Sequence, residues 1–129
     1  MTESEIEKDV ADRIPQATQQ KVKWAMNLLT TWHEEWKTRL DDQLKVFLPV
    51  EEWSASDLNH VLRYFLCEIR KADHSFYPPQ TLKEIVSMIQ HFFNNTLKKS
   101  FSIFMDKEFV HARDVLDAQM KKKEPEWGW

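Results

Sequence analysis

The sequence predicts an all-α fold, a compact bundle of four main helices, on three observations. Its 129 residues are enough for one domain with a hydrophobic core. Its single glycine, Gly128, is second from the end, whereas the tight turns of β-hairpins usually need glycine. Apolar residues recur at helical spacings in four separate stretches. Together these observations favour helices over strands throughout.

The first helix is predicted from about Gln16 to Arg39, after an acidic leader over residues 1–13 that we expect to be flexible. Pro15 precedes it as a helix-starting residue. Five apolar residues at spacings of three and four share one helical face: Val22, Ala25, Leu29, Trp32 and Trp36. Trp24 lies off this face, which widens the apolar side of the helix.

The second helix is predicted from Ala55 to Lys71. A connector over residues 41–52 precedes it, and the apolar residues of this connector predict that it packs onto the core. Ser54 and Asp57 resemble a capping box, with Asp in the place of the usual Glu. The buried face of this helix should consist of Leu58, Val61, Leu62, Phe65 and Ile69.

Two further helices complete the bundle. Pro78 and Pro79 stop any helix from running through, and Pro79 suits a first helical turn, so we predict a third helix from Pro79 to Asn94. Residues 97–105 are irregular but apolar and should cover the core. Asp106 is expected to cap the fourth helix, which presents four residues on one side: Phe109, Ala112, Leu116 and Met120. The helical domain therefore spans residues 14–123, followed by a tail over residues 124–129.

Composition excludes several classes of function. With one glycine there is no Gly-rich phosphate loop. Cys67 is alone and cannot form an internal disulfide, and it is expected to be a buried structural thiol. The five histidines lack the spacing of a metal site. No apolar run approaches 18 residues and no signal region is present. We therefore expect no membrane insertion, no metal, no cofactor and no enzymatic activity, in a reducing intracellular compartment.

Charge is distributed unevenly. Residues 1–13 carry five carboxylates and two basic side chains, so they account for the whole net charge of −3, and the remainder is balanced. Any DNA contact must therefore come from a local face. Thr, Lys, Gln and His residues on the first and third helices form the candidate face: Thr18, Lys21, Lys23, Thr81, Lys83, Gln90 and His91.

Each of these side chains has a chemical reason to contact DNA. Helix starts attract phosphate through free N–H groups, and Thr hydroxyls with Lys ammoniums strengthen such an anchor. Gln90 and His91, farther along the third helix, could reach base edges in a major groove. From composition alone, an ordinary charged surface explains the same residues.

A set of motifs in one order adds a family resemblance. They read Ile14-Pro15-x-x-Thr18, Trp24-Ala25, Tyr77-Pro78-Pro79-x-Thr81-Leu82, Ile89-Gln90, and Phe109-x3-Arg113-x2-Leu116-Asp117-Ala118-x-Met120-Lys121. This pattern, over about residues 14–121, resembles the N-terminal core-binding (SAM-like) domain of tyrosine recombinases and integrases. It is most similar to the type found in Crypton transposons and in their domesticated relatives, the MYM-type zinc-finger and glutamine-rich nuclear proteins.

The resemblance implies a nuclear module for DNA recombination or integration that holds double-stranded DNA through the starts of the first and third helices. It places a DNA-facing role on the seven residues named above. Gln90 stands where an Arg is common in the family, so the resemblance does not imply for Gln90 the phosphate or guanine contact that an Arg would make. The family's catalytic Arg, Lys, His and Tyr residues belong to a separate domain that this sequence does not contain, so we expect no DNA cleavage by this chain.

The alternative interpretation is a domesticated protein–protein interaction or self-association domain that has kept the fold and lost DNA binding. Near-neutral charge and the acidic leader favour it. So do Trp127 and Trp129, which a core does not explain and which could fill a groove on a partner.

Overall fold

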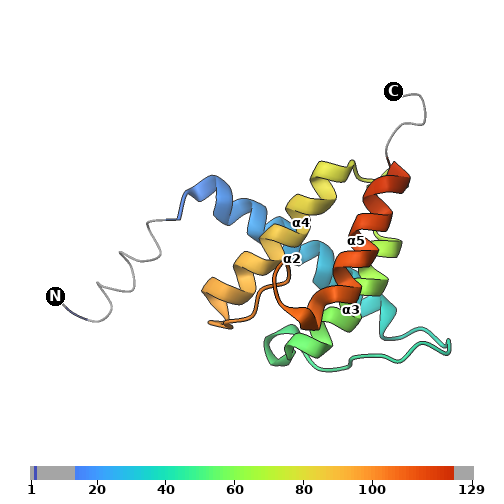
Figure 1. Ribbon diagram of the computed structural model, residues 1–129, viewed down its shortest axis with the longest axis horizontal. Helices are drawn as coiled ribbons and strands as arrows, with labels where there is room; N and C mark the ends of the chain where they lie inside the picture. Colours follow the sequence, from blue (N-terminus) through green and yellow to red (C-terminus); the bar gives the residue numbers. More distant parts are fainter. Residues whose placement is uncertain (1, 3–13, 124–129) are drawn as a thin grey trace.

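The computed structural model describes Thr2 and residues 14–123, and within them it is helical with no strand (Figure 1). The four main helices are α2 (Gln16–Trp36), α3 (Ala55–Glu68), α4 (Pro79–His91) and α5 (Val110–Lys123). The predicted all-α bundle of four helices is thereby confirmed. The predictions for the acidic leader and for the tail with Trp127 and Trp129 fall outside the described residues.

The helices pack as two contacting pairs. α3 lies along α5, α2 crosses α4, and α4 also contacts α5 (Figure 1). Two side-chain bonds fix α3 and α5 in the same direction: Asn59 Oδ1 accepts from the Ala112 backbone N–H at 3.1 Å, and Gln119 Nε2 donates to Cys67 Sγ at 3.6 Å. Cys67 is exposed, so the expectation of a buried thiol is wrong.

The core between the helices is rich in aromatic rings. Trp36 is fully buried and stacks on Trp32 with their ring centroids 5.1 Å apart. Trp53, just before α3, is also fully buried and contacts the buried ring of His33 edge-on at 4.9 Å. Most residues of the predicted helix faces are buried or partly buried in this core. Burying rings of this size contributes most of the stabilisation of a small domain.

The starts of α3 and α4, which carry a polar cap and a proline pair respectively, form as predicted. At α3, Ser54 Oγ accepts from the Asp57 backbone N–H at 3.1 Å, and the Asp57 carboxylate accepts from the Ser54 N–H at 3.0 Å. This reciprocal pair is a complete capping box. At α4, Pro78 is the N-cap and Pro79 occupies the first turn.

Two predicted helix ends are too long. α2 stops at Trp36 instead of Arg39. The Thr38 and Arg39 N–H groups donate to carbonyls three residues back, at Glu35 and Trp36, so the helix ends in a tighter turn, after which Arg39 pairs with Glu35 and, across the fold, with Glu68. α3 stops at Glu68 instead of Lys71, because Ile69 takes an extended backbone and is buried. At Ile69, burial in the core overrides local helix preference.

The region after α4 differs in detail from the prediction. α4 ends at His91 and continues as a wider π-helical turn, η2 (Phe92–Thr96), so the helical path passes the predicted end at Asn94. Residues 97–105 largely cover the core as expected, with Ile103 buried and Met105 the exposed exception. The Asp106 carboxylate accepts from the Ser102 N–H and does not cap the next helical turn, η3 (Lys107–Phe109).

The connector between α2 and α3 differs most from the sequence prediction. Val46 is partly buried and Val50 is buried, but Leu44 is 76% exposed, Phe47 67% and Leu48 46%. The prediction that this segment packs onto the core is therefore wrong for its largest apolar side chains.

Candidate nucleic-acid interface

The starts of α2 and α4 share an unusual chemistry. Each has proline at the N-cap, Pro15 and Pro78, and neither receives a side-chain cap. Neither first turn contains an acidic residue. The first N–H groups of a helix have no intrahelical acceptor. Here they carry the positive end of the helix dipole without a carboxylate to offset it.

The two helices contact each other close to these starts. Lys21 Nζ lies 3.0 Å from Glu84 Oε1. The Trp24 ring meets the Tyr77 ring edge-on with their centroids 6.2 Å apart. The beginning of α4 therefore lies beside the second and third turns of α2. Tyr77 is buried, and this burial raises the pKa of its phenol, so the Tyr77–Leu82 segment also anchors α4 to the core.

The predicted phosphate contacts fall into two groups. Thr18 and Thr81 are half-buried in the two first turns, while Lys21, Lys23 and Lys83 are exposed. Lys21 shares its charge with Glu84. Within residues 14–123, no carboxylate forms an ion pair with Lys23 or Lys83. The two unpaired lysines are thus the stronger candidates for neutralising phosphate.

The Gln90 side chain forms hydrogen bonds within the fold. Its Nε2 donates to Asn94 Oδ1 at 2.8 Å and to the Phe101 carbonyl at 3.0 Å, and its Oε1 accepts from the Ile103 N–H. Both ends of the amide are thus occupied inside the fold. A base contact through this side chain would require these bonds to break.

His91 and Gln90 are also distant from the helix start. At 1.5 Å per residue, Gln90 lies about 14 Å along the axis from Thr81. His91 is half-buried, and its carbonyl accepts from Asn95 Nδ2 at 3.1 Å. The Lys21–Glu84 ion pair places Lys21 beside the beginning of α4, which carries Thr81 and Lys83, whereas the two proposed base-reading residues lie at the other end of α4.

The sequence analysis missed two side-chain contacts, one between α2 and α4 and one before α5. Glu84 pairs with Lys21 from a position 63 residues away, a contact without a local sequence signal. Arg113, which the family motif includes, donates to the carbonyls of Ile103 and Asp106 at 2.8 and 2.7 Å and so secures the loop before α5.

Residues 14–123 contain no cluster of three or more potential metal ligands. In the same part of the chain, none of the helices has the length and apolar character needed to cross a bilayer. Comparison with protein-family models, with curated proteins and with solved structures found no match. The likeness to recombinase core-binding domains therefore rests on the sequence motifs alone.

Proposed function

We propose that this chain is a nuclear DNA-binding module of tyrosine-recombinase ancestry, which grips duplex DNA through the starts of α2 and α4 and contributes binding, not catalysis. The observation that supports it most is the pair of uncapped, acid-free helix starts flanked by exposed lysines. Free N–H groups, Thr hydroxyls and Lys ammoniums are the groups that position proteins on the phosphate backbone.

The binding we expect is electrostatic and of low sequence specificity. The Gln90 amide is occupied by internal hydrogen bonds. His91 is therefore the remaining candidate for a base contact, because no described residue forms a hydrogen bond with its ring nitrogens. If Lys21, Lys23 and Lys83 each neutralise one phosphate, the logarithm of the affinity should fall with the logarithm of salt with a slope of about −3.

Fluorescence anisotropy with a labelled duplex of about 20 base pairs, at low salt, tests this proposal. The test variant is Lys23→Glu with Lys83→Glu, which avoids placing a second carboxylate beside Glu84. The control is Lys107→Glu with Lys122→Glu, which makes the same change in net charge at exposed positions on η3 and α5. We expect the test variant to bind at least about tenfold more weakly than the control. Equal binding by the two variants would refute this assignment of the interface.

A second candidate function is protein–protein interaction without DNA binding, and the exposed apolar connector favours it. The self-association version of this candidate depends on Trp127 and Trp129. Light scattering of the full chain and of residues 1–123 tests it, because only the full chain should form oligomers if the tail mediates assembly.

A further inference from the structure

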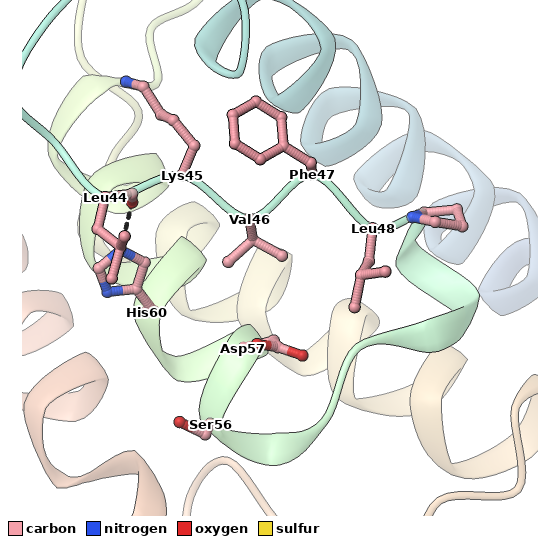
Figure 2. Close-up of a pocket in the computed structure, with 9 residues that line it drawn as sticks. Leu44, Lys45, Val46, Phe47, Leu48, Ser56, Asp57 and His60 are labelled. Carbon is pink, nitrogen blue, oxygen red and sulfur yellow. Dashed lines mark hydrogen bonds between the residues drawn. The ribbon is translucent and has the colours of Figure 1, made fainter.

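Residues 44–48 of the connector run across the start of α3 with alternating side chains (Figure 2). Leu44, Val46 and Leu48 point toward α3, while Lys45 and Phe47 point the opposite way. An open hollow of about 570 Å³ lies between this segment and the first turns of α3, lined on the helix side by Ser56, Asp57 and His60. This alternation is typical of an extended backbone, and the segment bends at Leu48.

One edge of this extended segment is fixed to the fold by side-chain donors. The carbonyls of Leu44, Val46 and Leu48 accept hydrogen bonds from three separate elements. The donors are His60 Nε2 at 2.6 Å, His33 Nε2 at 2.7 Å and Trp53 Nε1 at 2.8 Å. Because His33 and Trp53 are buried in the core, the inner edge of residues 44–48 is held in one position.

The other edge is open. In an extended segment, the N–H and C=O groups of neighbouring residues point to opposite sides, so those of Lys45 and Phe47 lie on the edge opposite the three donors. Among the described residues, none forms a hydrogen bond with these four groups. An open strand edge is a template for another extended chain, and two residues of this kind offer four hydrogen bonds.

The surroundings of the open edge specify the charge of what it would bind. Lys45 is not free, because its Nζ lies 2.7 Å from Asp41 Oδ1 and over the Trp36 ring. Asp42, Glu51 and Glu52, at the two ends of the segment, are exposed and form no ion pair within residues 14–123. The surface is therefore apolar at its centre and acidic at its ends, which favours cationic partners and repels nucleic acid and anionic lipid.

We propose that the open edge of residues 44–48 binds, by strand addition, an extended segment of a partner protein in which Lys or Arg alternates with apolar residues. The backbone of the partner segment pairs with Lys45 and Phe47. Its apolar side chains cover the exposed Leu44, Phe47 and Leu48, and its cationic side chains meet the carboxylates at either end. The connector follows the C-terminal end of α2, about 30 Å from the helix start proposed to bind DNA, so both partners can bind at once.

A defined peptide tests this proposal with the full chain. The probe is fluorescein-labelled Lys-Leu-Arg-Val-Lys-Leu-Arg, and the control peptide replaces each Lys and Arg by Glu. We expect the basic peptide to bind with a dissociation constant below about 100 μM at low salt, and the acidic peptide to bind at least tenfold more weakly. No binding of the basic peptide up to about 1 mM would overturn the proposal.

Charge reversal locates the site. Glu51→Lys with Glu52→Lys should weaken binding of the basic peptide at least about tenfold. Glu108→Lys with Asp114→Lys, at exposed positions on η3 and α5, makes the same change in net charge and should weaken it much less. Equal weakening by the two variants would show that only net charge matters and would contradict the assignment.

Amide hydrogen exchange distinguishes strand addition from general adhesion. Bound peptide should slow exchange at Lys45 and Phe47 at least about tenfold, and it should change exchange at the first turn of α4 very little. Unchanged exchange at both Lys45 and Phe47 in the presence of bound peptide would refute strand addition. Protection of these two amides in the chain alone, at concentrations where it sediments as a dimer, would identify a second copy as the occupant and would also overturn the proposal.

Discussion

Replacing Gln90 by methionine should destabilise the protein although it leaves the length and helix preference of the side chain nearly unchanged. The Gln90 amide is the link between α4 and the segment that covers the core before α5. It bonds to Asn94, to the Phe101 carbonyl and to the Ile103 N–H. Methionine fills the same space and makes none of these bonds.

The size of the effect follows from which groups lose their partner. The Phe101 carbonyl still accepts from Asn94 Nδ2 at 3.1 Å, so its loss is small. Ile103 is buried, and its N–H has no other acceptor among the described residues. An unsatisfied buried N–H costs about 1–3 kcal/mol, so we expect the free energy of unfolding to fall by about 2 kcal/mol. For a domain of this size that lowers the melting temperature by roughly 6–10 °C.

Urea unfolding followed by circular dichroism measures this difference. Gln80→Met is the matched control, because Gln80 lies exposed in the first turn of the same helix and its replacement should change stability by no more than about 0.5 kcal/mol. If Gln90→Met is as stable as Gln80→Met, the amide does not hold the segment and the argument that Gln90 is unavailable to DNA fails.

Two further predictions concern the helix cap and acid stability. Ser54→Ala removes the capping-box acceptor and should lower the free energy of unfolding by about 1 kcal/mol in urea titrations, whereas Ser56→Ala, two residues further on, should change it less. Hydrogen bonds from Lys45 to Asp41 and from Arg39 to Glu35 lower the pKa of each carboxyl. Because the folded-state pKa lies below the unfolded one, these groups stabilise the fold above their ordinary pKa values, and that contribution is lost as the pH falls through the folded values. As the pH falls below about 4, the urea concentration at the unfolding midpoint should therefore decrease, and it should decrease less steeply in Asp41→Asn. An identical dependence of the midpoint on pH in that variant would contradict this.

Signals confined to a few neighbouring residues were predictable from the sequence. The proline starts of α2 and α4 and the Ser54–Asp57 cap need only local chemistry. The buried faces of the helices followed from their periodicity. These features act within one or two helical turns, so no tertiary information is needed to find them.

Features that depend on distant contacts were missed. Arg39 forms an ion pair with Glu68 from another helix, and the role of Gln90 depends on carbonyl and N–H groups 11 and 13 residues away. The connector is apolar and therefore looks buried, yet His33, His60 and Trp53 bond to its carbonyls while Leu44 and Phe47 stay exposed. Apolar composition alone does not say which side of a strand faces the core.

The most direct test of the proposed function is an NMR titration of the isotope-labelled full chain with a duplex of about 20 base pairs at low salt. The account predicts that the largest shift changes fall on the backbone amides of the first turns of α2 and α4, from Gln16 to Gln19 and from Gln80 to Lys83. The amides of residues 44–48 should be unaffected. Absence of any change, or changes centred on residues 44–48, would contradict the claim that this module binds DNA through its two proline-led helix starts.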